Sequence, residues 1–274
     1  MASQFVPRPI TTTSAAQQIA EQIRLGIMRG ELPLGQRLPS ESELAAEFSV
    51  SRGTIRETMK LLSAQRLVEA TRGAAGGTFV RLPEPVDVAA AMGDTITLWF
   101  NAGSTSVAEV NDAREWIERA CTIMAARHRT EAELESICAA VEAMEAPGIE
   151  MDEMLEIDID FHVAVSRAAH NAVLELAMNA IHIVRPYTNT MIMPLLSIPT
   201  IAQQHRAIFE AIAVCDEERA RAAFDIHVAH LEEVRQRALA DRRAEEVPVS
   251  ELTHEAHPDV ERIRARILGR PPRP

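Results

Sequence analysis

The residues best suited to chemistry are an aspartate and three histidines at positions where helical periodicity predicts apolar side chains. In the segment DIDFHVAVSRAAHN, Asp158 and His162 are four residues apart and therefore lie on one face of a predicted helix. The same face carries Leu155, Val165 and Ala169, so it is predicted to point into a core. Buried carboxylates and imidazoles cost free energy unless each has a partner.

Two further apolar stripes each contain one inward histidine, His205 in the first and His227 in the second. A divalent metal ion such as Zn, Ni or Mn would satisfy the aspartate and the three histidines together. The alternative is that each histidine is a hydrogen-bonded core residue, and His182 and His230 show how easily extra candidates arise among 9 histidines. The apolar members of the two stripes are Ile201, Ile208 and Ile212, and Ala220, Phe224, Leu231 and Val234.

An arginine also lies on an inward stripe. Arg114 falls among Val107, Val110, Ile117, Cys121 and Met124 at helical spacing. One interpretation is an internal salt bridge to an aspartate or glutamate; the other is that its guanidinium binds a carboxylate of a small effector in a bidentate manner. Further along, Arg185, Tyr187 and Asn189, around a bend at Pro186, are candidates to line the same site.

Charge divides the chain into two parts. Residues 1–82 contain 10 Lys and Arg against 7 Asp and Glu, net +3, whereas residues 83–274 contain 18 against 33, net −15. Only the first part is therefore expected to meet a polyanion. The prolines of LPEP mark the join. The three cysteines have no CxxC spacing, which favours reduced, buried thiols, and the absence of a signal peptide or a membrane-spanning stretch predicts a cytoplasmic protein.

The basic part predicts a winged helix-turn-helix. A helix begins after Ser14 and ends near Gly30, and a short one follows the capping box of Ser40 and Glu43. A tight turn leads into SRGTIRETMKLLSAQRLV, a third helix with cations on one face. The glycine-containing segment LVEATRGAAGGTFVRL is then typical of a two-stranded wing.

Residues 12–82, which contain LPSESELAAEFSVSRGTIRETMKLLSAQRLVEATRGAAGGTFV, resemble the winged helix-turn-helix of GntR-family bacterial transcription regulators. The resemblance implies that the third helix contacts bases and phosphates in the major groove and that the wing enters the minor groove. Ser42 and Gly53 replace an arginine and a threonine of some FadR-type members, so either a different operator or a greater contribution of the wing to DNA binding is expected. The implied DNA-binding residues are Arg52, Thr54, Arg56, Lys60, Arg72 and Gly73.

The acidic part predicts helices throughout, so the fold class is mostly α, with the winged helix-turn-helix followed by an all-α antiparallel bundle. A short extra helix is predicted within the charged tail, at PDVERIRARILG. The predicted spans are 86–100, 106–129, 131–145, 151–169, 171–193, 199–214 and 216–243. The predicted organisation is an N-terminal arm at 1–11, a DNA-binding domain at 12–82, a linker at 83–85, an effector-binding and dimerisation domain at 86–243 and a C-terminal tail at 244–274.

Residues 86–243 resemble the FCD effector domain of FadR-type GntR regulators, in segments such as DIDFHVAVSRAAHNAVLE and QQHRAIFEAIAVCDEERARAAFDIHVAHLEEV. Metal-binding members have Asp-x-x-x-His, a His opening HRAI, and a His 22 residues later. The resemblance thus implies a metal site at Asp158, His162, His205 and His227, with His227 favoured over His230, and an organic-acid effector bound near Arg114, Arg185 and Asn189.

These expectations describe a homodimeric repressor that binds a pseudo-palindromic double-stranded DNA operator and responds to a small carboxylate, with no membrane partner. Two alternatives are open. In the first, the protein is a metal-responsive regulator in which the ion is the signal. In the second, less favoured because no HExxH or other general base lies beside a ligand, it is a metal-dependent enzyme.

Overall fold

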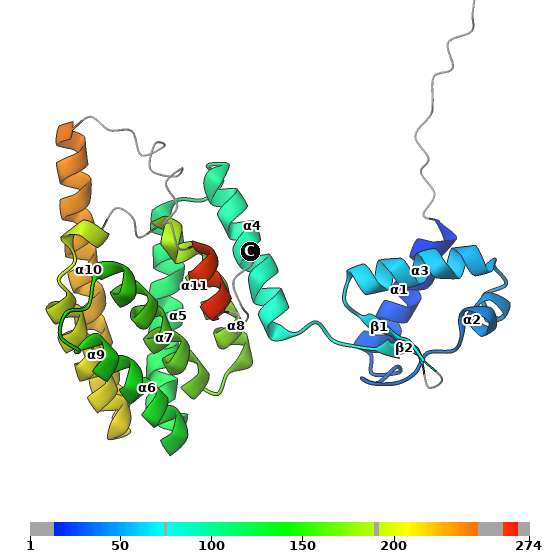
Figure 1. Ribbon diagram of the computed structural model, residues 1–274, viewed down its shortest axis with the longest axis horizontal. Helices are drawn as coiled ribbons and strands as arrows, with labels where there is room; N and C mark the ends of the chain where they lie inside the picture. The colour runs from blue at the N-terminus through cyan, green and yellow to red at the C-terminus, as the bar shows by residue number, and fades with distance from the viewer. Residues whose placement is uncertain (1–13, 74–75, 189–191, 246–259, 268–274) are drawn as a thin grey trace, which may run out of the picture. The chain divides into compact units, whose positions relative to one another are not determined.

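The chain folds into two compact units, Met1–Glu84 and Pro85–Pro274, which are mostly helical (Figure 1). The computed structural model describes residues 14–73, 76–188, 192–245 and 260–267. The predicted N-terminal arm and Asn189 lie outside these residues. The fold class expected from the sequence is confirmed, with three helices and a two-stranded sheet in the first unit and helices in the second.

In the first unit, serine caps set where the helices begin. Ser14 caps α1 (Ala15–Met28) and Ser40 caps α2 (Glu41–Glu47), each in a reciprocal capping box with the third helical residue. Ser49, with a φ of 54°, turns the chain from α2 into α3 (Arg52–Ala64), which Ser51 caps. The strands β1 (Val68–Thr71) and β2 (Gly77–Val80) pair antiparallel as the wing.

One apolar cluster holds these elements together. Ile55 and Leu62 of α3 are fully buried, as their spacing of seven residues on an amphipathic helix requires. Thr58, on the same face, donates its hydroxyl to the Ala16 carbonyl oxygen of α1 at 3.2 Å. The other buried members of the cluster are Ile19, Ala20, Ile23, Leu38, Leu44, Ala45, Val68 and Val80. The buried face of α3 therefore fixes the position of the helix, and its opposite face remains exposed to solvent.

The second unit is a helical bundle whose elements follow the sequence prediction within a few residues. The helix predicted at 171–193 is described as α8 over Ala172–Thr188, and it does not reach residue 193, where a 3-10 turn at Met193–Leu195 begins. The three cysteines are free, as expected, but only Cys121 is buried. Cys138 is half-buried and Cys215 is exposed, so the expectation of buried thiols is wrong at these two positions. The helices are α4 (Pro85–Asn101), α5 (Val107–His128), α6 (Glu131–Met144), α7 (Met151–Ala168), α8 (Ala172–Thr188), α9 (Ile198–Ala213), α10 (Glu217–Glu245) and α11 (Val260–Ile267).

The predicted extra helix of the tail exists as α11, and it packs on α7 and α8. Arg266 of α11 pairs with Asp160 through Nε at 2.7 Å and with Glu156 through Nη1 at 2.7 Å, both on α7. Ile267 joins an apolar cluster with Leu155 of α7. The tail thus supports the side of α7 that carries Glu156 and Asp160. In the part of the chain that the structure describes, no helix has the length and apolarity to cross a bilayer.

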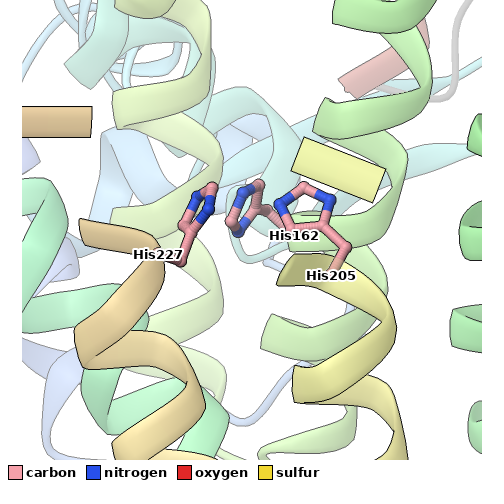
Figure 2. Close-up of side chains that lie close together, drawn as sticks. All are labelled: His162, His205 and His227. Atoms are coloured by element: carbon pink, nitrogen blue, oxygen red, sulfur yellow. The ribbon is translucent and has the colours of Figure 1, made fainter. Parts of the chain in front are cut away.

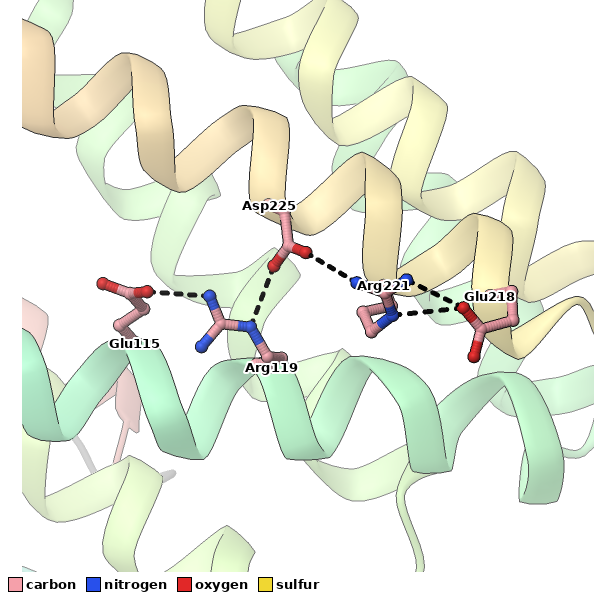
Figure 3. Close-up of polar contacts among 5 residues, drawn as sticks. All are labelled: Glu115, Arg119, Glu218, Arg221 and Asp225. Carbon is pink, nitrogen blue, oxygen red and sulfur yellow. Dashed lines mark hydrogen bonds and ion pairs between the residues drawn. The ribbon is translucent and has the colours of Figure 1, made fainter.

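An ion-pair chain ties α5 to α10 (Figure 3). Arg119 of α5 donates to Asp225 of α10 through Nε at 2.8 Å and to Glu115 through Nη2 at 2.7 Å. Asp225 also accepts from Arg221 at 3.1 Å, and Arg221 pairs in addition with Glu218 of its own helix at 2.8 Å. Among these ion pairs, Arg119 is therefore the cation that joins the two helices, whereas Arg221 pairs only within α10.

Replacing Arg119 with alanine should lower the free energy of unfolding by about 1 kcal/mol, because its side chain is only 19% exposed and pairs across helices. The matched control is Arg221→Ala, which removes a cation from the same aspartate but breaks no contact between helices. It should lower the free energy of unfolding by only ~0.3 kcal/mol. Urea unfolding followed by circular dichroism measures both. Equal losses would contradict the role of Arg119 as a link between α5 and α10.

Candidate functional site

Three histidine rings converge from separate helices in the interior of the bundle (Figure 2). His162 comes from α7, His205 from α9 and His227 from α10. A ligand nitrogen of each lies within 4.8 Å of the others, and all three side chains are buried. The ring centroids are 5.1 Å apart for His162 and His205 and 4.8 Å apart for His205 and His227.

Asp158 lies beside these rings without joining the group of mutually close ligand atoms. Its Oδ1 is 3.6 Å from Nε2 of His205 and 3.8 Å from Nε2 of His162. Its Oδ2 is 2.5 Å from Nη2 of Arg185 on α8. The carboxylate therefore presents one oxygen to the imidazoles while an arginine holds the other.

Neighbouring side chains orient two of the three rings. Nδ1 of His227 is 2.8 Å from Oε1 of Gln204, an acceptor, so this nitrogen carries the proton and Nε2 is left as an acceptor. Nδ1 of His162 is 3.4 Å from Oε1 of Glu118 on α5, which favours the same tautomer. His205 stacks on Phe161, with centroids 4.1 Å apart and planes at 9°. The Nε2 atoms of all three histidines have no hydrogen-bond partner among the described residues.

The inward arginine of α5 has an internal partner. Nε of Arg114 donates to Oε1 of Glu118, one turn along the helix, at 2.9 Å, and both side chains are buried. This is the internal salt bridge that the sequence left open as one interpretation. Arg114 lies close enough to Asp158 for the charge of each to shift the pKa of the other.

Burial and charge set the protonation of the site. Burial lowers the pKa of His162, His205 and His227, in the case of His205 to about 3, although the Asp158 carboxylate opposes the shift. Burial alone would raise the pKa of Asp158, but the Arg185 guanidinium holds it well below its usual range. The site therefore contains an ionised carboxylate and neutral imidazoles, which is the form in which both ligate metals.

The structure brings together most of the site residues predicted from the sequence. The aspartate and the three inward histidines meet, and Arg114 and Arg185 lie beside them. Glu118 and Gln204 were not predicted. Glu118 follows Arg114 by four residues, so the helical period was a signal for it. Gln204 had none, since its role comes from the packing of α9 on α10.

The predicted DNA-binding residues of α3 lie at its start and along its outer face. Arg52 is exposed at the first helical position, and Thr54 is held by the Ser51 cap, with its amide 3.1 Å from the serine Oγ. Arg56 pairs with Glu41 of α2 at 3.0 Å, and Lys60 pairs with Glu57 at 2.8 Å. Both pairs are exposed, so they are weak and can exchange for other anions.

The wing presents the remaining predicted contacts. Arg72 is exposed directly after β1, and Gly73 has a φ of 113°, a conformation that residues with a Cβ rarely adopt. Arg37 forms an isolated bridge with Phe79 of β2 and thereby extends the edge of the small sheet. The wing is thus a short hairpin with a cation at its turn.

Comparison with known proteins gives matches to both units. The family model described as bacterial regulatory proteins, gntR family, matches residues 15–80, and the FCD domain model matches residues 109–230. The HTH-type transcriptional regulator LutR of Bacillus subtilis is 30% identical over 76% of this chain and 95% of its own length. The galactonate operon transcriptional repressor of Escherichia coli is 29% identical over 77% and 93%. Among solved structures, a GntR protein of Streptococcus agalactiae matches with a TM-score of 0.49 and 21% identity, over 80% of this chain and 99% of that one.

Acid should destabilise the metal-free protein through these buried histidines. An unfolded chain binds a proton on each histidine below about pH 6.5, whereas the folded chain excludes it until its lowered pKa is reached. Stability is therefore present above pH 6.5 and is lost as the pH falls, by about 1.4 kcal/mol per pH unit for each histidine. Between roughly pH 6 and pH 4, unfolding of the wild type should take up about one proton more than unfolding of His205→Phe. The unfolding free energy of the variant should therefore depend less steeply on pH, by about 1.4 kcal/mol per pH unit. Urea titrations in the presence of a chelator measure this slope, and an unchanged slope would show that His205 is protonated in the folded protein.

Proposed function

This chain belongs to the GntR family of bacterial transcription regulators. We propose that it is a homodimeric repressor and that a small carboxylate, bound beside a metal ion, controls its affinity for its operator. The family assignment makes it a DNA-binding regulator and not an enzyme, so the metal-dependent enzyme considered from the sequence is wrong. The name of the Escherichia coli relative supports the sign of regulation, because that protein is a repressor.

The first unit supports operator recognition by α3 and the wing. Arg52 and Arg56 project from the start of α3, the part of a recognition helix that reaches base edges in the major groove. A homodimer would place two such helices about 34 Å apart on a pseudo-palindromic site. Large exposed apolar side chains in the second unit support self-association, among them Trp116, which is 70% exposed.

Arg56→Ala should weaken operator binding at least about tenfold and reduce its salt dependence by about one ion, because Arg56 can exchange Glu41 for a phosphate or a base. The operator is first selected from a library of random duplexes, and affinity is then measured by fluorescence anisotropy at several salt concentrations. Arg29→Ala is the matched control, since it removes an exposed cation of the same unit outside α3 and the wing. Equal effects of the two variants would contradict the assignment of α3.

The observation that carries the metal and effector part of the proposal is that three buried histidines bring ligand nitrogens within 4.8 Å of one another. Their Nε2 atoms have no hydrogen-bond partner among the described residues. Neutral imidazoles from three helices, with one oxygen of Asp158 beside them, suit Zn, Ni or Mn. When bound, such an ion supplies positive charge and coordination positions for an acidic ligand. Gln204 and Glu118 hold the rings with Nε2 facing the site, the role of second partners at metal centres.

Charge balance favours an anionic effector. Two arginines and two carboxylates at the site cancel one another formally, as the pairs Arg114–Glu118 and Arg185–Asp158. A divalent ion then leaves a buried excess of two positive charges, which is costly unless an anion compensates it. A small carboxylate does so and can take Arg114 or Arg185 as a partner. The relative named for galactonate, itself a carboxylate, fits this class.

Control of DNA binding requires the effector to prefer one arrangement of the two DNA-binding units over another, since a ligand indifferent to both shifts nothing. The site joins residues of α5, α7, α8, α9 and α10, so a ligand there bears on most of the bundle at once. A metal-responsive regulator is the alternative, and it predicts operator affinity that tracks the free metal concentration without any carboxylate.

Untagged protein purified without chelator should contain about one divalent ion per chain by elemental mass spectrometry, and His205→Ala should lose it, because a missing ligand lowers metal affinity at least about tenfold. His170→Ala is the matched control, since His170 is an exposed histidine of the same unit that pairs with Glu133. No ion in the wild type, and none taken up when Zn, Ni or Mn is offered, would contradict the metal site.

A further inference from the structure

A fourth histidine lies beside the three-histidine group without belonging to it. His182 of α8 is fully buried, and neither of its ring nitrogens has a hydrogen-bond partner among the described residues. A buried imidazole in this state costs free energy, since water solvates both nitrogens in the unfolded chain. Nothing in the packing of α8 requires a polar side chain there, because its neighbours Ile181, Ile183 and Val184 are buried apolar residues.

The position of His182 links it to the candidate site. Its ring centroid is 5.8 Å from that of His162, with planes at 39°. The charges that act on it are those of Arg185, Glu118 and Arg114, which belong to the same site. Its nitrogens are nevertheless outside the set of ligand atoms that lie within 4.8 Å of one another. His182 therefore lies next to the candidate metal ligands without being one of them.

The chemistry of His182 differs from that of the charged groups at the site. The ring is fully buried and has no ion-pair partner among the described residues, so it is neutral. A neutral imidazole has one donor and one acceptor, whereas Arg114 and Arg185 only donate and ionised carboxylates only accept. A hydroxyl group also donates and accepts, and it complements such a ring without adding charge.

We propose that His182 is a specificity-determining residue that hydrogen-bonds a hydroxyl group of the effector, so that the protein responds to hydroxycarboxylates in preference to the corresponding deoxy acids. This inference rests on the proposed function and narrows its ligand class. The arginines and the ion hold the carboxylate, and His182 selects for the hydroxyl. A site built to bond a hydroxyl discriminates strongly against an analogue that lacks it, because its own polar group is then left buried and unpaired.

The test uses matched acids that differ by one hydroxyl, malate with succinate and lactate with propionate, titrated into the metal-loaded full chain by calorimetry. Wild type should bind the hydroxy acid of at least one pair about tenfold or more tighter than its deoxy partner. In His182→Leu this preference should shrink to within about twofold, and His182→Gln, which keeps a donor and an acceptor, should retain part of it. The exposed His128→Leu is the control and should behave as wild type.

Two further readouts separate this role from a structural one. His182→Leu should keep about one ion per chain. Without added carboxylic acid ligand it should melt at the same temperature as wild type or higher, because the substitution removes an unpartnered buried imidazole. Loss of the ion, a lower melting temperature in both variants, or an unchanged or absent hydroxyl preference would overturn the proposal. A wild type that binds acids and metal without such a preference overturns only the role of His182, whereas a wild type that binds neither overturns the proposed function as well.

Discussion

The cost of burying polar groups is the constraint on which the second unit depends. Its interior contains two arginines, two carboxylates and four imidazoles in one region, where apolar side chains would pack at lower cost. The ion pairs Arg114–Glu118 and Arg185–Asp158 offset part of that cost. The imidazoles are compensated only in part, because Nε2 of His162 and His227 and both ring nitrogens of His205 and His182 have no hydrogen-bond partner among the described residues. Each such nitrogen costs free energy that an apolar side chain would not.

The rest of the bundle makes such an interior tolerable. Large apolar clusters flank the site, with Phe161 and Phe224 fully buried next to His205 and His227. Outside the core, Arg119 ties α5 to α10 and Arg266 ties α11 to α7. These contacts hold the helices that carry the site residues, so the imidazoles stay in place although their Nε2 atoms have no hydrogen-bond partner among the described residues. Preorganisation of this kind lowers the free-energy cost of binding a ligand, because the side chains are already ordered.

Much of this arrangement could be predicted from the sequence, for a physical reason. The helical period places Asp158, His162, His205 and His227 on inward faces, and the resemblance to a known family relates the three helices to one another. Periodicity gives a direction for each side chain but no partner across helices. The pairing of Asp158 with Arg185 and of Gln204 with His227 arises only when α8, α9 and α10 pack together, so neither pair could be predicted. The helix predicted to reach residue 193 does not, since a 3-10 turn begins there, because a hydrophobic period does not locate a helix end.

The cost of burying polar groups also explains a difference between the two units. In the first unit, the predicted DNA-binding residues lie on the surface, where Arg56 and Lys60 form weak ion pairs with Glu41 and Glu57. A phosphate displaces such a carboxylate at little cost, because both charges remain in water throughout. In the second unit the polar groups are buried, so exchange of a partner changes the free energy of the whole bundle. A surface of exchangeable pairs suits contact with many DNA sites, and a buried site of incompletely compensated groups suits one small ligand. This is the division of labour that the proposed control by an effector requires.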